Sequence, residues 1–565
     1  MSLLGSLQMA GNSLQANQIA IQVVGQNIAN DNTPGYIQEN VDLQPGPTQE
    51  IGNLLLGSGV RVQGVQQQLD TFLEARLRDA MSDESNTSTQ SSTYTQLEQI
   101  VNALGSTNLG TAMTNFFSSI AQVLNSPQDV STQNQVVLQG QTLTNTINSM
   151  AQQINSLRGN VNQQVASMAG QINQLTGEIA SLNGQIAEVQ NGVGGQSDAG
   201  GLQDQRLSDL ESLAQLTSIQ VENQADGTVN VYAGGEYLVY GSNVNQINVA
   251  YQNSGGMNVA QLQIAGSNAV LDPSSGQLAG LLASRDTALG GFLDTLNSFS
   301  QTLADEFNKV YSGGQGLTGY QQLTSENAVD SANLALNQAG LSCTPQNGDF
   351  QLLVKNTQTG LTQTSDIRVD LSGDGNDLTL NGLAAELSQV NGITASVTAD
   401  NRLSISCSSP NEQFAFSSDN SGALAALGLN TFFTGDSASG LGVNATLAND
   451  PSLLASSSGG IGTDTNNAAT LANFANQALA SQGGNTLTDL YDNMTSDLAQ
   501  ASATASSSSQ AAQSFSATLT SQKASESGVN LDDQTIQLMA FQRAYQASAN
   551  FIQTIQQMFQ TLLQI

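Results

Sequence analysis

The sequence contains no histidine and no tryptophan, and only 12 lysine and arginine residues stand against 45 aspartate and glutamate residues in a chain of 565. The lack of histidine removes the usual general base, the usual zinc ligand and the Ser–His and Cys–His nucleophile pairs. Carboxylate, lysine or tyrosine chemistry is most of what remains for an enzyme. The formal net charge of −33 disfavours binding to nucleic acid and to anionic membrane surfaces, because both need clustered basic side chains.

Cysteines and long apolar runs are also scarce. Cys343 and Cys407 are the two cysteines of the chain, and the sequence leaves open whether they form a disulfide or are two small buried residues in one β-rich segment. No apolar run reaches the ~20 residues of a transmembrane helix. The first basic residue is Arg61, so the positive region of a secretory signal peptide is missing. We therefore expect a protein that is cytosolic or is exported without cleavage of an N-terminal signal.

A regular apolar pattern runs through the middle of the N-terminal half. Between Ile147 and Val189 apolar residues recur at alternating spacings of three and four, with one additional four-residue step after Leu157. This is a heptad pattern, and it predicts a helix of about 45 residues, ~65 Å long. A coiled-coil arrangement is favoured, and a single amphipathic helix in a globular bundle is the alternative.

Both ends of the chain carry an apolar stripe at the same spacing. An amphipathic helix must bury such a stripe against a partner, because an isolated helix is marginally stable in water. We expect the two terminal helices to pack against each other and against other copies of the chain. The residues predicted to make these contacts are Leu7, Leu14, Ile21 and Ile28 at the N-terminus and Leu538, Phe541, Tyr545, Ile552, Ile555, Phe559 and Leu562 at the C-terminus.

The helical period fades between residues 340 and 440, where short apolar runs alternate with turn residues and predict strands. A smaller β region lies near 217–265, with a hairpin turn predicted at Asp226-Gly227. The predicted fold class is α+β, mainly α: a long coiled-coil-like helical bundle from both termini with an inserted β-rich outer domain. The expected domains are an inner terminal domain at 1–70, a middle helical domain at 71–340, the outer domain at 341–440, the return of the middle domain at 441–524, and the C-terminal helix of the inner domain at 525–565.

Two patterns could indicate a chemical site, and each has a simpler interpretation. Residues 372–380 resemble a single calcium-binding nonapeptide, but such a site needs stacked copies to complete its oxygen ligands, which favours a β-turn. The Asp532-Asp533 pair could serve a glycosidase, but Asn530 just before it favours a helix start with an N-cap. The sequence therefore predicts no catalytic, cofactor-binding or metal-binding residues, and a protein that is not an enzyme.

Residues 27–36 read NIANDNTPGY and predict the end of a helix. Asn30 and Asn32 tolerate the left-handed conformation of a helix C-cap. Pro34-Gly35 fits the centre of a type II turn, and Tyr36 is expected to open a short strand. A generic helix-to-strand turn would account for these residues alone.

This motif, through Asn27, Ala29, Asn30, Thr33, Pro34, Gly35 and Tyr36, resembles that of the rod–hook family of bacterial flagellar axial proteins. Further strings along the whole chain are similar to the hook-associated protein 1 family, which forms the hook–filament junction. These strings are 69–77, 202–206, 226–231, 426–435, 527–533 and 541–549. The chain departs from the family in its two cysteines and in its serine-rich segment at 502–509.

The resemblance implies a structural adaptor that polymerises as a ring at the hook–filament junction and connects the hook to the filament. It implies as partners other copies of the chain, the hook protein, a second junction protein on the filament side, and a dedicated export chaperone at the C-terminal segment. It implies no cofactor, and a place in the extracellular flagellum reached through the flagellar type III channel without a cleaved signal peptide. The alternatives are a distal-rod or hook protein of the same axial family, or an unrelated secreted coiled-coil adhesin.

Overall fold

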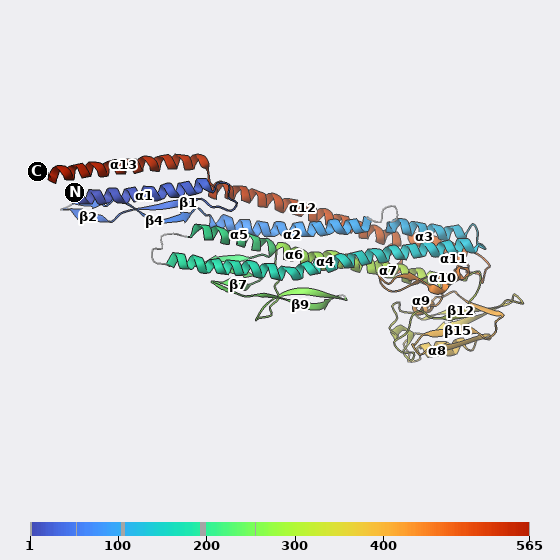
Figure 1. Ribbon diagram of the computed structural model, residues 1–565. Helices are drawn as coiled ribbons and strands as arrows, with labels where there is room; N and C mark the ends of the chain where they lie inside the picture. Colours follow the sequence, from blue (N-terminus) through green and yellow to red (C-terminus); the bar gives the residue numbers. More distant parts are fainter. Residues whose placement is uncertain (1–2, 52–53, 103–107, 192–198, 255, 564–565) are drawn as a thin grey trace. The chain divides into compact units, whose positions relative to one another are not determined.

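The computed structural model describes residues 3–51, 54–102, 108–191, 199–254 and 256–563 (Figure 1). The chain forms two compact units. The first unit comprises Met1–Thr93, Gly159–Arg285 and Ala503–Ile565, and the second comprises Tyr94–Arg158 and Asp286–Ser502. The α-helices α2 (Thr71–Asn102), α4 (Val130–Asn191) and α12 (Leu487–Ser527) contribute residues to both units, as does the short π-helix Ser284–Gly290.

Helix α4 is the helix that the heptad pattern predicts. It spans 62 residues and begins at Val130, well before the first residue of the predicted pattern. Its apolar stripe is covered: Ile147, Ile154 and Ile186 are each 0% exposed. Burying an apolar side chain of this size contributes about 1.5–3 kcal/mol. Packing of this stripe therefore stabilises α4 more than the intrinsic propensity of its Gln-, Asn- and Ser-rich surface does.

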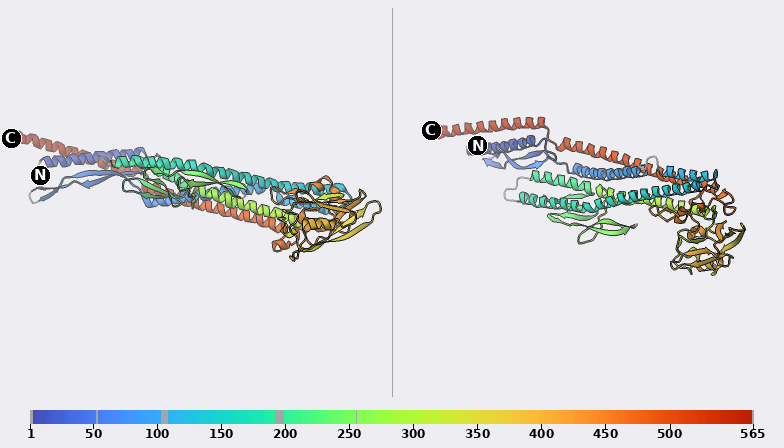
Figure 2. Two further views of the ribbon diagram at one scale, coloured as in Figure 1. Left: turned by 90° about the horizontal axis from the view of Figure 1, so that it is seen from below. Right: turned by 45° about the vertical axis from the view of Figure 1, so that its right-hand side comes forward.

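The two ends of the chain meet in the first unit. Helices α1 (Leu3–Ala29) and α13 (Leu531–Leu563) run alongside each other in the views of Figures 1 and 2. Between α1 and α2 the chain forms two antiparallel strand pairs, β1 with β4 and β2 with β3. These strands are β1 (Glu39–Pro45), β2 (Thr48–Ile51), β3 (Leu54–Gly57) and β4 (Val60–Gln67).

The remainder of the first unit adds two helices and two small antiparallel sheets. Strands β5 to β8 form one sheet in chain order, and β9 pairs with β10. Asp226 and Gly227 lie in the turn between β5 and β6, with Gly227 at φ +82°, so the predicted hairpin is confirmed. The elements are α5 (Gly200–Leu216), β5 (Gln220–Asn223), β6 (Val229–Ala233), β7 (Glu236–Tyr240), β8 (Asn243–Val244), β9 (Ile247–Ser254), β10 (Met257–Ile264) and α6 (Gly276–Ala283).

The second unit combines helices with the β-rich segment. Two three-stranded sheets, β13-β12-β16 and β11-β15-β14, share a core in which Phe350, Leu403 and Phe414 are 0% exposed. The helices are α3 (Leu109–Val123), α7 (Gly291–Tyr311), α8 (Leu380–Leu387), α9 (Ala423–Leu427), α10 (Ala445–Asn449) and α11 (Asn466–Ala472). The strands are β11 (Gln322–Thr324), β12 (Gly348–Asn356), β13 (Thr362–Val369), β14 (Ile393–Val397), β15 (Leu403–Cys407), β16 (Glu412–Ser417), β17 (Phe433–Thr434) and β18 (Gly442–Val443).

Aromatic side chains gather where the β-rich segment returns to the helices of the second unit. Phe116 of α3, Phe307 of α7, Phe432 and Phe433 pack with ring centroids 4.8–5.6 Å apart. Asn308 fixes the backbone beside them, because its Nδ2 donates to the Phe433 carbonyl (2.9 Å) and its Oδ1 accepts from the N–H groups of Phe432 and Phe433 (3.0 Å each). The string at 426–435 therefore packs the end of the β-rich segment against helices α3 and α7.

The predicted fold class, α+β and mainly α with a β-rich insertion, is confirmed. The question of the cysteines is also answered: Cys343 and Cys407 are free thiols, and each is half-buried. Among the described residues, no helix combines the length and the apolar character needed to cross a membrane.

Candidate functional site

The motif at residues 27–36 forms the end of α1 and the turn that follows it. Helix α1 ends at Ala29, and the Asn30 N–H still bonds to the Gln26 carbonyl (3.0 Å). The Tyr36 N–H bonds to the Thr33 carbonyl (3.2 Å), which closes a turn around Pro34 and Gly35. Gly35 has φ +79°, the value that the third residue of a type II turn requires. The predicted turn is therefore confirmed.

Two details of the predicted turn are wrong. Neither Asn30 nor Asn32 adopts a left-handed conformation; Gly35 does so instead, since a residue without Cβ reaches positive φ without strain. The strand begins at Glu39 rather than at Tyr36. The reason is that the Tyr36 side chain turns back to the helix, where its hydroxyl donates to Asn27 Oδ1 (2.7 Å).

Asn27 joins three segments of the chain and is 1% exposed. Its Nδ2 donates to the Glu39 carbonyl (2.9 Å) and to Gln534 Oε1 (3.0 Å). Its Oδ1 accepts from the Glu39 N–H (3.0 Å) and from the Tyr36 hydroxyl. Burial and the neighbouring Glu39 carboxylate raise the pKa of Tyr36, which keeps this hydroxyl a donor. Asn27 thus uses the full bonding capacity of its amide to connect α1, β1 and α13.

The start of α13 is held from both sides. Asn530 Oδ1 accepts from the N–H groups of Asp532 (3.0 Å) and Asp533 (3.4 Å), so the interpretation of the acidic pair as a helix start is confirmed. The segment after the motif contacts the end of α12, where the Gln38 N–H donates to the Ser527 carbonyl (2.9 Å). The N-terminal motif therefore positions the C-terminal helix.

Replacing Asn27 by alanine is expected to destabilise this joint by about 3–4 kcal/mol. The substitution leaves the Tyr36 hydroxyl, the backbone of Glu39 and the buried Gln534 amide without partners, and each such group costs about 1–3 kcal/mol. Hydrogen exchange of the Glu39 amide measures the effect, and its exchange should become much faster. The control is Asn30→Ala, because Asn30 bonds at the surface to the Gln26 carbonyl. Equal exchange of the Glu39 amide in both variants would contradict the assigned role of Asn27.

The residues predicted to pack between copies lie on α1 and α13. Few of their side chains are buried within a single chain. The covered positions of α1 are smaller residues, such as Ala16 and Ala20. On α13, Ile555 is 2% exposed and Leu562 is 58% exposed. The remaining predicted residues are half-buried: they are Leu7, Leu14, Ile21, Ile28, Leu538, Phe541, Tyr545, Ile552 and Phe559.

Helix α13 also exposes apolar residues outside the predicted seven-residue series. Ile536 is 61% exposed, Phe551 is 43% exposed and Met558 is 51% exposed. At 3.6 residues per turn these three lie on one side of the helix, away from the side of Leu538 and Tyr545. A full helical projection of the C-terminal segment would have revealed them. Contiguous exposed apolar surface is typical of a protein-binding face.

An asparagine of α4 forms hydrogen bonds to the backbone of the β5–β8 sheet, in the way that a neighbouring strand would. Asn183, which is 0% exposed, donates to the carbonyls of Val229 (2.8 Å) and Gly241 (2.7 Å) and accepts from the Val229 N–H (3.1 Å). Arg206 of α5 donates from Nη1 to Asn183 Oδ1 (2.9 Å) and to the Gly227 carbonyl (2.7 Å). The strings at 202–206 and 226–231 therefore meet at this asparagine.

A second asparagine of α4 makes the same kind of contact, which we call an asparagine clamp: its amide bonds to the backbone of a strand and to an arginine. Asn162 Oδ1 accepts from the Ala260 N–H (2.7 Å) and from Arg285 Nη1 (3.0 Å), and Arg285 also donates to the Ala260 carbonyl (2.7 Å). The sequence alone does not single out either asparagine, because an amide in a Gln- and Asn-rich helix carries no local signal of a buried partner.

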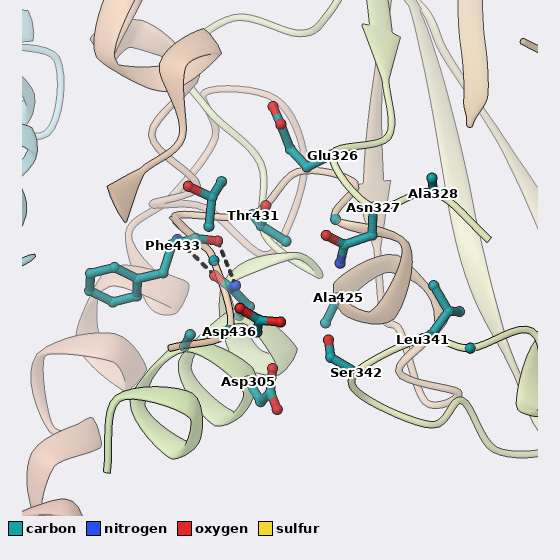
Figure 3. Close-up of a pocket in the computed structure, with 16 residues that line it drawn as sticks. Asp305, Glu326, Asn327, Ala328, Leu341, Ser342, Ala425, Thr431, Phe433 and Asp436 are labelled. Carbon is teal, nitrogen blue, oxygen red and sulfur yellow. Dashed lines mark hydrogen bonds between the residues drawn. The ribbon is translucent and has the colours of Figure 1, made fainter. Parts of the chain in front are cut away.

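A pocket of about 340 Å³ opens in the second unit (Figure 3). Three carboxylates line it, from Asp305, Glu326 and Asp436, and Figure 3 shows Asp305 next to Asp436. Burial raises the pKa of Asp305, and the Lys309 ammonium opposes this shift. Within the described ranges, no group of three or more His, Cys, Asp or Glu side chains is placed to hold a metal ion.

Three family profiles match separate parts of the chain. One described as Flagellar hook-associated protein FlgK helical domain matches residues 94–324. Those described as Flagella basal body rod protein and Flagellar basal body rod FlgEFG protein C-terminal match residues 7–36 and 521–565. Curated proteins named Flagellar hook-associated protein 1, from Escherichia coli (strain K12) and Salmonella typhimurium (strain LT2), are 26% and 27% identical, with 98% of this chain and 98% and 99% of theirs covered. The chain is similar to flagellar hook-associated protein 1 over nearly its whole length.

The two rod-protein profiles match the two ends of the chain, and Asn27 and Gln534, which bond to each other, lie within these matched ends. A further relative named Flagellar hook-associated protein 1, from Bacillus subtilis (strain 168), is 25% identical over 153 residues, which is 26% of this chain and 30% of that protein. A solved structure titled as the flagellar hook junction protein FlgK from Burkholderia pseudomallei is 20% identical and covers 80% of this chain and 99% of that chain, with a TM-score of 0.49.

Proposed function

We propose that this chain is a structural adaptor of the bacterial flagellum that connects the hook to the filament at their junction. The observation that carries the proposal is the alignment of relatives named Flagellar hook-associated protein 1 over 98% of the chain. The helical-domain profile of the same family at residues 94–324 supports it. The paired chain ends, with stripes that one chain leaves partly uncovered, suit a protein that works as part of an assembly.

In this proposal the chain polymerises as a ring through its terminal helices. Helices α1 and α13 pack against the same helices of neighbouring copies, which buries the stripe from Leu7 to Ile28 and the stripe from Leu538 to Leu562. Each large apolar side chain that becomes buried contributes about 1.5–3 kcal/mol. Gln and Asn side chains set the register by hydrogen bonds, because like charges would repel between copies that each carry a net charge of −33.

The domains follow from the same proposal. Residues 1–70 and 525–565 form the inner domain that makes the ring. Residues 71–340 and 441–524 form the middle domain, and residues 341–440 form the outer domain. The Asn27 joint supports the first assignment, since it binds the two parts of the inner domain together.

The partners in the proposed function are other copies of the chain, the hook protein, a second junction protein on the filament side, and a dedicated export chaperone that holds the C-terminal segment. The chain reaches the extracellular flagellum through the flagellar type III channel without a cleaved signal peptide. A chain that passes in a largely unfolded state benefits from free thiols at Cys343 and Cys407, because a disulfide would hold a loop closed during passage.

Deletion of the gene tests the proposed function. Electron microscopy of the cells is expected to show bare hooks, and the culture medium is expected to contain unpolymerised flagellin on a gel. Both should revert when the gene is restored on a plasmid. Normal filaments in the deletion strain would contradict the junction function and favour an unrelated adhesin.

A distal-rod or hook protein is the second candidate, because the profiles at both chain ends describe basal body rod proteins. The same deletion separates this candidate from the first. Cells without hooks would indicate a rod or hook protein, since the hook is built on the rod, whereas bare hooks indicate the junction.

A further inference from the structure

A second pocket, of about 230 Å³, lies in the first unit and is lined by α2, α5 and the strands β4, β5 and β6. Its lining includes two buried arginines, Arg78 at 9% exposure and Arg206 at 8%, together with Glu74 at 2%. Apolar side chains such as Leu207 and Val229 complete the lining. Two buried guanidinium groups in one small pocket are unusual for a chain with only 12 basic residues.

Neither arginine is neutralised by an ion pair within the described residues. Arg78 has no hydrogen-bond or ion-pair partner there. Arg206 donates to Asn183 and Gly227, which are both neutral acceptors. Burial lowers the pKa of Arg206 to about 10, still well above neutral pH, so the guanidinium stays charged. No nitrogen of Arg78 is among the fully buried side-chain atoms without a partner, so its unbonded guanidinium nitrogens remain open to a ligand with oxygen atoms.

Three carboxylates act on Arg78, and a lysine is paired with two of them. Lys523 of α12 binds Glu74 Oε1 at 2.9 Å and Glu211 Oε1 at 2.5 Å. Arg78, Arg206 and Lys523 therefore lie among three carboxylates, Glu74, Glu211 and Asp79, of which Lys523 pairs with the first two and Asp79 is exposed to solvent. Burial raises the pKa of Glu74, against the opposing effect of Lys523.

We propose that this pocket binds a carboxylate, and that in the assembled junction this carboxylate is an Asp or Glu side chain of a second copy of the chain. The planar fork of Arg78 matches the two oxygens of a carboxylate. The volume is below the roughly 300–1,000 Å³ of sites for drug-sized ligands and suits one side chain. Each copy presents 45 acidic residues against 12 basic ones, so a neighbour offers carboxylates in excess. The assignment of the carboxylate to a second copy rests on the proposed self-assembly. Binding of a carboxylate by the pocket does not.

Glutarate binding to the purified full-length chain tests the pocket without assembly. At constant ionic strength, glutarate should raise the midpoint of thermal unfolding by about 2–4 °C at saturation, and its neutral counterpart glutaramide should not. Arg78→Gln should need about tenfold more glutarate for the same shift. The matched control is Arg76→Gln, which removes the same charge from an exposed position on α2 that does not line the pocket, and which should respond as the wild type does.

Three outcomes would overturn carboxylate binding: no response of the wild type to glutarate, an equal response to glutaramide, or an equal response of Arg78→Gln and Arg76→Gln. If Arg78→Gln fails to fold, as judged by circular dichroism, Arg78→Lys replaces it. That variant keeps the charge but lacks the fork, so it should also weaken glutarate binding.

The source of the carboxylate is tested in the deletion strain. Arg78→Gln should be exported into the medium but should retain filaments poorly, whereas Arg76→Gln should restore filaments fully. Normal filaments with Arg78→Gln, in a variant that has lost glutarate binding, would overturn the second copy as the source. Failure of the wild-type gene itself to restore filaments would instead count against the proposed junction function.

Discussion

A chain with proline in place of Leu538 is expected to be exported but not to be incorporated at the hook–filament junction. Leu538 is half-buried in the second turn of α13. Proline there removes the N–H that bonds to the Gln534 carbonyl and places its ring against that carbonyl, at a cost of about 3 kcal/mol or more. The break falls beside the Gln534 amide, which binds Asn27 at 3.0 Å, so it separates the two chain ends as well as interrupting the stripe of α13.

The matched control is proline at Leu531, the first residue of α13. Proline is tolerated at this position because the N–H of the first helical residue has no partner within the helix. In the deletion strain, Leu531→Pro should restore motility, and Leu538→Pro should leave bare hooks with the variant chain and flagellin in the medium. If Leu538→Pro assembled and restored motility, packing through α13 would be ruled out as the basis of incorporation.

Replacing Asn183 by alanine is expected to destabilise the first unit by about 3–5 kcal/mol, the range for breaking a buried network with a charged member. The change leaves the N–H and carbonyl of Val229 and the carbonyl of Gly241 without their partner. It also removes one of the two acceptors of the buried Arg206 guanidinium. Urea denaturation measures the loss of stability, and hydrogen exchange of the Val229 amide measures the loss of the clamp itself.

The control for this prediction is Asn245→Ala in the same sheet region. Asn245 is exposed and makes a hydrogen bond to the Tyr237 carbonyl (2.8 Å), so its loss should cost about 1 kcal/mol or less. A Val229 amide that stays equally protected in Asn183→Ala and Asn245→Ala would show that Asn183 does not hold the strand to α4.

Local patterns are sufficient to predict the long helices and the tight turns of this chain. Helix α4 is predictable because its buried positions, such as Ile147 and Ile186, repeat along the sequence. The turn at Pro34-Gly35 is predictable because the two residue types restrict φ in complementary ways. The start of α4 at Val130 is not, because the first turns of the helix lie outside the heptad pattern that marks its stripe.

Long-range hydrogen bonds explain most of what the sequence does not show. Strand β1 begins at Glu39 rather than Tyr36 because Asn27 binds both residues. Asn183 bonds to Val229, 46 residues away, and no local rule distinguishes its amide from the exposed amides around it. The pairing of the two chain ends was predicted from their stripes, whereas the joint that aligns them at Asn27 depends on side-chain geometry.

The bond between Asn27 and Gln534 joins residues that are 507 positions apart in the chain. In an unfolded chain, closing a loop of that length costs roughly 5–6 kcal/mol of conformational entropy. The hairpins and helical turns of the middle segments close much shorter loops, so they form first and the ends come together last. If the chain is exported unfolded and assembles with other copies, as proposed, its apolar ends would pair late, and contacts between copies would form at the end of folding.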